Sequence, residues 1–272
     1  MQSAFDEATH LSARPILVTL GLLSLTACSG KTPPTTAPGR SSSAPPPIHY
    51  DQTSVLTSEG QPTEQHSYQR LRDDCQKSGL PMHALAPEEE SKVGRVHVEA
   101  WIGPNKQSRR EEEWHIEDST PCQFSLAHSD QIQIDDANGR ATLVDAVTHK
   151  VEVQELGKPA PVTALPASDG ELTEGERQAG WIKKSTASDH GAQCAIWEDA
   201  SGFQLCVWTG GREWGYSADG ATALKDGLSR GDSIVLWAHP GRGPGWKLET
   251  QQFSVGAALD ERAFAVPANT EK

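Results

Sequence analysis

The sequence predicts a mainly β protein: a curved, open antiparallel sheet with one or a few short helices. Three observations lead to this fold class. Beyond residue 90, apolar side chains recur at every second position over many short stretches, which is typical of strands with one buried face. Asn138-Gly139 separates two such stretches and strongly indicates a tight hairpin turn. Helical spacing is seen mainly in one stretch, so we expect helices to be a small part of the fold.

The first segment, residues 1–27, is typical of an export signal. A charge-free apolar run precedes Leu25-Thr26-Ala27-Cys28, and it is too short to span a bilayer as a helix. This pattern resembles the lipobox of bacterial lipoproteins. The resemblance implies that signal peptidase II cleaves before Cys28 and that Cys28 carries the acyl chains. With Ser29 in the next position, it also implies sorting to the periplasmic side of the outer membrane.

A tether and a helix are expected next. Residues 28–49 are rich in Pro, Ser and Thr, and they have too few apolar side chains to offset the entropy lost on ordering. We therefore expect a disordered tether, followed by a single β-rich domain over 50–272. A helix is predicted at 63–78, ended by Gly79 and Pro81. The side chains that could dock this helix on the sheet are Tyr68, Leu71, Cys75 and Leu80.

The strands are expected in two groups. The first group is a meander of about six strands, at 93–102, 109–118, 122–127, 131–135, 141–147 and 150–156. A Pro- and Gly-rich stretch at 157–179 interrupts the rhythm, with a short helix expected at 173–179. The second group is expected at 181–185, 193–198, 203–208, 213–216, 233–238 and 246–255, with one or two helical turns at 221–228.

Four cysteines remain besides Cys28, and in an oxidising compartment an even number predicts two disulfides. Zinc is the competing interpretation, but the chain has no Cys-x-x-Cys pair and its histidines are scattered, so no metal site is expected. In the hairpin around residue 200, a three-residue turn brings Cys194 opposite Cys206. That pairing leaves Cys75 with Cys122.

Four tryptophans of the second group are the candidate ligand-facing aromatics: Trp181, Trp197, Trp208 and Trp237. They could form a platform for a ligand, but large aromatic side chains at period two in strands more often fill a core. We therefore favour a filled core over a ligand cavity.

The end of the chain, with Leu259, Phe264, Val266 and Pro267, resembles the close of proteins with the outer-membrane lipoprotein carrier fold (LolA/LolB-like). The resemblance extends over about 93–270. It implies a half-barrel closed by helices, with a cavity for acyl chains. The small helix content and the tryptophans in place of small aliphatic residues count against lipid carriage here.

The net charge and the absence of known motifs argue against several classes of function. The net charge of −13, with no basic run, argues against nucleic acid partners and against electrostatic adhesion to a membrane, so attachment would rest on the acyl chains of Cys28. No nucleophile elbow, zinc-protease motif, phosphate loop or dinucleotide fingerprint is present, and no cofactor or catalytic residue is expected. Acidic runs at 88–90 and 111–113 could at most supply a carboxylate pair.

These observations predict a non-enzymatic envelope lipoprotein that binds a periplasmic protein or an apolar ligand. Two alternatives remain open. One is an inhibitor or immunity lipoprotein that acts on a periplasmic cell-wall enzyme through an acidic surface. The other is an envelope hydrolase that uses the acidic runs.

Overall fold

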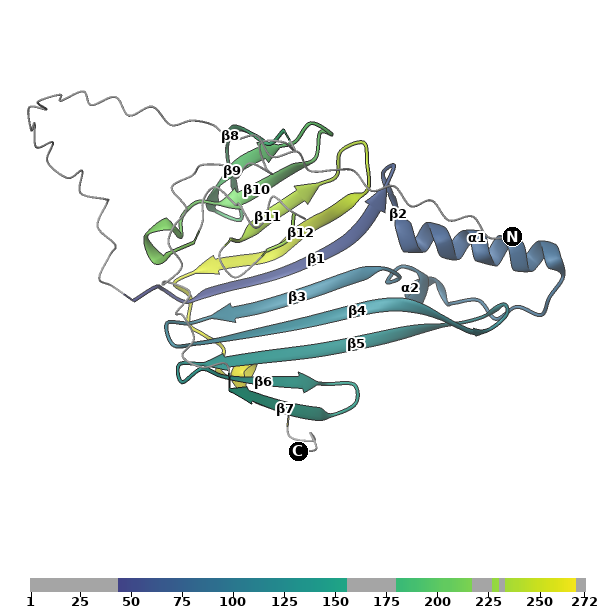
Figure 1. Ribbon diagram of the computed structural model, residues 1–272, viewed down its shortest axis with the longest axis horizontal. Helices are drawn as coiled ribbons and strands as arrows, with labels where there is room; N and C mark the ends of the chain where they lie inside the picture. The colour runs from purple at the N-terminus through teal and green to yellow at the C-terminus, as the bar shows by residue number, and fades with distance from the viewer. Residues whose placement is uncertain (1–43, 156–179, 217–226, 230–232, 268–272) are drawn as a thin grey trace, which may run out of the picture. The chain divides into compact units, whose positions relative to one another are not determined.

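The computed structural model describes residues 44–155, 180–216, 227–229 and 233–267 (Figure 1). The chain divides into two units, Met1–Gly39 and Arg40–Lys272, and every described residue belongs to the second. The predicted leader and most of the tether lie outside the described residues, as do the helix expected at 173–179 and most of the one expected at 221–228.

Within the described residues, twelve strands form one sheet in which every ladder between strands is antiparallel. The order is β7-β6-β5-β4-β3-β1-β12-β11-β10-β9-β8, with β2 paired to β1 outside this path. The sheet is open, because its two outermost strands, β7 and β8, do not pair with each other. Two α-helices accompany it in this part of the chain. The predicted fold class, an open antiparallel sheet with few short helices, is confirmed.

The central strand of the sheet is β1 (Ile48–Ser58), which lies between β3 and β12 (Figure 1). β2 (Gln61–Pro62) adds a short ladder to its end. The predicted tether, which extends to residue 49, is too long, because the chain enters the sheet at Ile48 as the unpredicted strand β1. This strand joins the two groups of strands, since the first group extends from one of its edges and the second group from the other.

Buried polar side chains explain why β1 was missed. Gln52 is buried in the middle of the strand, and its amide donates to the carbonyl oxygen of Val235 at 2.6 Å and to Oγ1 of Thr250 at 3.1 Å. Ser54 and Thr57 are buried as well. Because these polar groups occupy inward positions, the strand lacks the apolar alternation on which the prediction depended.

The first group of strands is a meander of five strands rather than six: β3 (Arg95–Ile102), β4 (Lys106–Thr120), β5 (Gln123–Asp136), β6 (Arg140–Asp145) and β7 (Lys150–Glu155). The two strands expected at 122–127 and 131–135 are one continuous strand, β5. The residues between them are polar, yet each has a partner on β4, and Asp130 lies opposite Glu112. The Asn138-Gly139 turn between β5 and β6 is confirmed.

The second group consists of β8 (Ile182–Asp189), β9 (Ala192–Glu198), β10 (Gln204–Trp208), β11 (Val235–His239) and β12 (Gly245–Val255). The strand expected at 213–216 is instead a 3-10 turn, Arg212–Trp214. Gly215 follows it with a φ of 97°, a left-handed conformation that ends the turn and that glycine adopts readily. A second 3-10 turn, Glu261–Phe264, follows β12.

The predicted helix, α1 (Thr63–Ser78), has the expected bounds and ends at Gly79, which is left-handed. Tyr68 and Cys75 dock it on the sheet, and the Tyr68 ring meets Phe124 edge-on at 5.3 Å. Leu71 and Leu80, also expected to dock, are 43% and 49% exposed. Fewer side chains of this region therefore contact the sheet than the spacing predicts. The second helix, α2 (Pro87–Glu90), is a single turn.

The buried apolar side chains form three clusters. The helix core packs α1 against the sheet and contains Tyr68, Cys75, Leu85, Val93, Cys122 and Phe124. The first core contains Ile48, Tyr50, Ala100, Cys194, Cys206, Trp208, Tyr216, Ile234, Leu236 and Phe253. The second core contains Trp181, Ala195, Trp197, Leu205, Val207, Val235, Ala238 and Leu248. Successive residues of β9 and β10 alternate between the first and second cores, so both faces of these strands are buried.

Both predicted cysteine pairs lie at disulfide distance. Cys75 on α1 pairs with Cys122 at the β4–β5 turn, with 5.7 Å between their Cα atoms, and Cys194 pairs with Cys206, with 5.4 Å. The register in the second pair differs from the expectation, because Cys206 lies opposite Ile196 rather than opposite Cys194. The turn between β9 and β10 occupies 200–202. Direct pairing of the two cysteines would need a turn one residue earlier, so they are diagonal neighbours on adjacent strands.

Candidate functional site

The four candidate tryptophans do not share a ligand platform. Trp181 and Trp197 lie in the second core, Trp208 lies in the first core, and Trp237 packs against the first core partly buried. Because they divide between two separate clusters, they cannot line one cavity. Close packing within each cluster supports the filled core that the sequence analysis favoured: the Trp208 ring, for example, lies 5.4 Å from both Tyr216 and Phe253.

The acidic run at 88–90 has structural partners. The carboxylate of Glu89 accepts a hydrogen bond from the backbone N–H of Ala86 at 2.9 Å, and Glu90 forms an ion pair with Arg72 at 3.2 Å.

The acidic run at 111–113 lies on β4, whose alternation places Glu112 on one face of the strand and both of its neighbours on the other. Burial and the neighbouring Glu111 raise the pKa of Glu113. Glu111 and Glu113 are thus neighbouring, hydrogen-bonded carboxyl groups on one face of β4, and Glu112 is separate from both.

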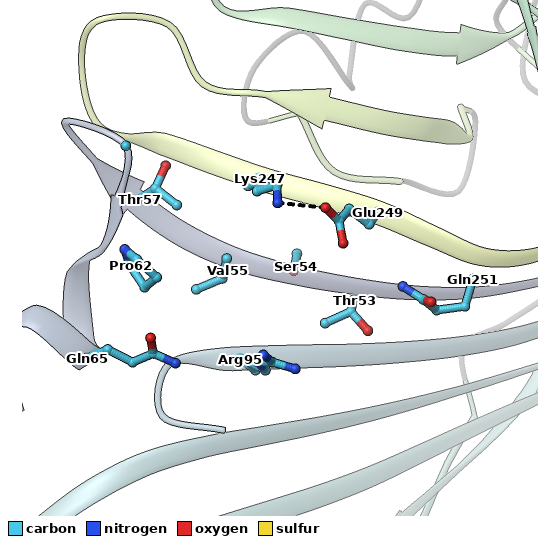
Figure 2. Close-up of a pocket in the computed structure, with 11 residues that line it drawn as sticks. Thr53, Ser54, Val55, Thr57, Pro62, Gln65, Arg95, Lys247, Glu249 and Gln251 are labelled. Carbon is cyan, nitrogen blue, oxygen red and sulfur yellow. Dashed lines mark ion pairs between the residues drawn. The ribbon is translucent and has the colours of Figure 1, made fainter. Parts of the chain in front are cut away.

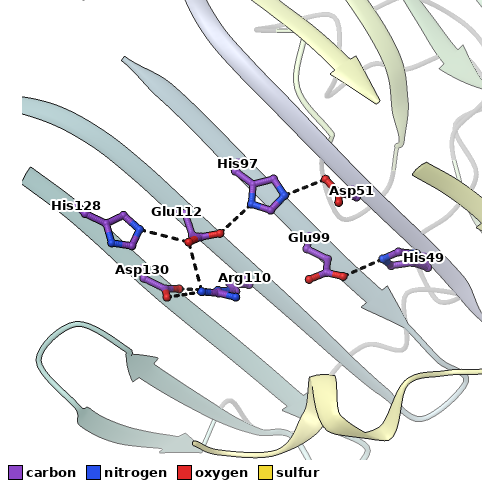
Figure 3. A network of polar contacts seen from close by, with 8 residues as sticks. All are labelled: His49, Asp51, His97, Glu99, Arg110, Glu112, His128 and Asp130. Carbon is purple, nitrogen blue, oxygen red and sulfur yellow. Dashed lines mark hydrogen bonds and ion pairs between the residues drawn. The ribbon is translucent and has the colours of Figure 1, made fainter. Parts of the chain in front are cut away.

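The site that the structure brings together lies instead on one face of β1, β3, β4 and β5 (Figure 3). We call it the charged face. Each strand contributes a histidine or arginine and, two residues later, an acid: His49 and Asp51, His97 and Glu99, Arg110 and Glu112, His128 and Asp130. The spacing of two keeps both members of each pair on the same face. The strand register then aligns them, with His97 opposite Glu112, Glu99 opposite Arg110 and Glu112 opposite Asp130.

His97 bridges two strands. Its Nε2 lies 2.9 Å from Oδ1 of Asp51 on β1, and its Nδ1 lies 2.9 Å from Oε2 of Glu112 on β4. Burial alone would lower the pKa of this imidazole, but the two carboxylates outweigh burial and the pKa is raised. Only the cation can donate from both nitrogens, so this geometry favours imidazolium. With both nitrogens engaged, His97 is poorly placed to act as a general base.

Glu112 is the hub of the charged face. Besides His97, its carboxylate meets Nη2 of Arg110 at 3.3 Å and Nε2 of His128 at 3.3 Å. Arg110 also holds Asp130 in a two-pronged contact, Nε to Oδ1 at 2.9 Å and Nη2 to Oδ2 at 2.7 Å. Hydrogen bonding to Asp130 raises the pKa of Arg110, so this side chain stays charged. The carboxylates are thus held by partners on neighbouring strands before any ligand arrives.

Aromatic rings support both ends of the charged face. His49, only 5% exposed, stacks on Trp101 with ring centres 3.7 Å apart, and its Nε2 lies 3.1 Å from Oε1 of Glu99. At the other end, Trp114 and His128 stack with ring centres 5.0 Å apart. These stacks fix the orientation of both imidazoles. Ion pairs and ring stacks therefore orient most side chains of the charged face.

The charge of this surface is negative, because four carboxylates outnumber Arg110 and protonated His97. The described residues contain no group of three or more His, Cys, Asp and Glu side chains that could hold a metal ion. An acidic surface whose side chains are already oriented, with Asp51 and Glu99 partly exposed, is suited to recognising a basic partner. This site was not predicted, although the sequence contains a signal for it: a histidine or arginine followed two residues later by an acid, repeated in four strands.

A polar pocket of about 400 Å³ lies beside the charged face, where β1, β3 and β12 meet the start of α1 (Figure 2). None of the four candidate tryptophans lines it. Its walls are formed by Thr53, Ser54, Val55, Thr57, Gly60, Pro62, Gln65, Arg95, Lys247, Glu249 and Gln251. Most of these side chains are polar, so the pocket is unlike a cavity for acyl chains.

Comparisons with known proteins add no family. No family model matches this chain, and no curated protein matches it. In the part of the chain that the structure describes, no helix is long and apolar enough to cross a membrane. Cys28 lies outside the described residues.

Proposed function

We propose that this protein is a lipid-anchored envelope lipoprotein, held at the periplasmic side of the outer membrane by acyl chains on Cys28, whose β domain binds a partner without catalysing a reaction. The lipobox pattern and the Pro-rich tether support the anchor. The two cysteine pairs at disulfide distance are consistent with an oxidising compartment. The cores filled with tryptophan argue against carriage of lipid.

The charged face carries the proposal of binding. Its carboxylates are spread over four strands and oriented by His97 and Arg110. Those of Asp51 and Glu99 are partly exposed, whereas Asp130 is buried. A partner with a basic surface would meet charges already in position, which speeds association and lowers the entropy cost of docking. We therefore propose a protein partner with a basic surface, rather than an apolar ligand.

Two variants of equal charge change test this. Asp51→Asn with Glu112→Gln removes two charges from the charged face, and Glu152→Gln with Glu155→Gln removes two from β7, where both side chains are exposed. A partner recovered with the lipidated wild-type chain should be lost with the first variant and kept with the second. Equal recovery with both variants would contradict the proposal.

The anchor has a separate test. Cys28→Ser removes the sulfur that a thioether needs, so this variant should not label with palmitate and should leave the detergent phase. Labelling and partition like those of the wild type would contradict the anchor. The charged face could still bind in that case, because its geometry does not depend on Cys28.

The acidity of the charged face also favours a second candidate, inhibition of a basic cell-wall hydrolase. A basic c-type lysozyme is a suitable probe, with cytochrome c as a basic protein that cleaves no cell wall. The full-length chain in detergent should slow the lysozyme, and added salt should weaken this effect by screening. Equal binding of cytochrome c and lysozyme, without inhibition, would contradict this candidate.

A further inference from the structure

The polar pocket beside the charged face has the dimensions of a small-molecule site. Its volume of about 400 Å³ lies within the range of roughly 300–1,000 Å³ that such sites span. Figure 2 shows Arg95 from β3, Thr53 from β1, and Lys247, Glu249 and Gln251 from β12 around one opening. Three strands and the start of α1 therefore converge on this pocket.

The charges in the pocket favour an anion. Nζ of Lys247 lies 2.6 Å from Oε1 of Glu249, and this pairing holds the pKa of the Glu249 carboxyl below its usual range. The exposed Arg95 guanidinium forms no salt bridge or side-chain hydrogen bond with any described residue, although its charge also helps to lower the pKa of Glu249. The pocket thus carries one surplus positive charge in a chain whose net charge is −13. A guanidinium fork is well matched to a carboxylate, which it binds through two hydrogen bonds.

The remaining polar groups suit hydroxyls. Gln251 is the extra residue of a β-bulge, because β12 slips by one residue against β1 between Asp51 and Gln52. Bulges redirect side chains, and here the amide lines the pocket. The side chains of Gln251 and Thr53 have no hydrogen-bond partner among the described residues, so both are available to a ligand. Pro62 and Val55 offer apolar surface for C–H groups.

We propose that this pocket binds a small sugar acid, a polyhydroxylated ring that carries one carboxylate. Arg95 binds the carboxylate, and Thr53 and Gln251 bind ring hydroxyls. The Lys247–Glu249 pair offers both a donor and an acceptor to the other hydroxyls. This pocket adjoins the charged face, since Thr53 lies opposite His97, but its proposed ligand requires neither the protein partner nor the anchor.

Calorimetric titration of the full-length chain in detergent tests the proposal with three probes: glucuronate, glucose and inorganic phosphate. Glucuronate should bind saturably. Glucose, which lacks the carboxylate, and phosphate, which lacks the hydroxylated ring, should each bind about tenfold more weakly. A tenfold change corresponds to about 1.4 kcal/mol. Equal affinity for glucose, equal affinity for phosphate or no saturable glucuronate binding would each overturn the assignment.

Two arginine variants locate the site. Arg95→Gln should weaken glucuronate binding at least about tenfold, by loss of a charge-assisted contact. Arg70→Gln, an exposed arginine on α1 away from the pocket, is the matched control and should leave the affinity unchanged. Circular dichroism checks that both variants fold. Equal glucuronate affinity in folded Arg95→Gln and wild type would overturn the site.

Discussion

The two halves of the sheet differ in what their faces hold. In β10 four consecutive residues, 205–208, are all buried, because one core covers each face of the strand. In β3 and β4 most side chains are partly exposed, and one face bears the charged network. The strands with two buried faces, β9 to β11, have the apolar contacts that a stable frame needs. The other half is free to carry polar side chains, and we infer that stability and binding are largely separated along this sheet.

The largest effect should come from the core of the second half. Trp197 is only 4% exposed, and Trp197→Ala should lower the free energy of unfolding by about 3–5 kcal/mol, the range for large-to-small changes in a filled core. Trp114→Ala, a change of the same size on the partly exposed charged half, should cost clearly less. Urea denaturation of both variants measures the difference. Equal costs would break the comparison between the halves.

The two cysteine pairs sharpen the comparison, since one lies in each half. Cys75 and Cys122 are separated by 47 residues and Cys194 and Cys206 by 12, so loop entropy gives about 4 and about 3 kcal/mol respectively. Replacing each pair with alanines should therefore destabilise more in the charged half, where the link holds α1. A larger loss for Cys194 and Cys206 would mean that core packing outweighs loop length.

Local patterns predicted much of this fold. The helix at 63–78, the Asn138-Gly139 hairpin and most later strands depend on spacing and turn residues that are close together in the sequence. β1 was missed because Gln52 finds its partners on β11 and β12, far along the chain. The charged face was missed for a related reason, since its ion pairs join four strands. The split of the tryptophans between two cores likewise depends on tertiary packing.

A smaller effect on the free energy of unfolding should appear when His97 is replaced and the pH is varied. The pKa of His97 is raised in the folded protein, so its contribution to stability is complete below the pKa of the unfolded chain, about 6.5. That contribution is lost as the pH rises through the folded pKa. The destabilisation caused by His97→Gln should thus be larger at pH 5.5 than at pH 9. His66→Gln, on an exposed position of α1, serves as the control. A pH-independent cost for His97→Gln would contradict the bridging role.

Photo-crosslinking in cells that produce the protein tests the central claim most directly. A photoreactive residue is placed at His128 on the charged face or at Ile182 on β8, which is exposed in the other half. The account predicts that a partner is crosslinked from position 128 and not from 182, and that Asp51→Asn with Glu112→Gln abolishes the crosslink. Crosslinking from position 182 alone, or an undiminished yield in the double variant, would contradict the claim that the charged face is the binding surface.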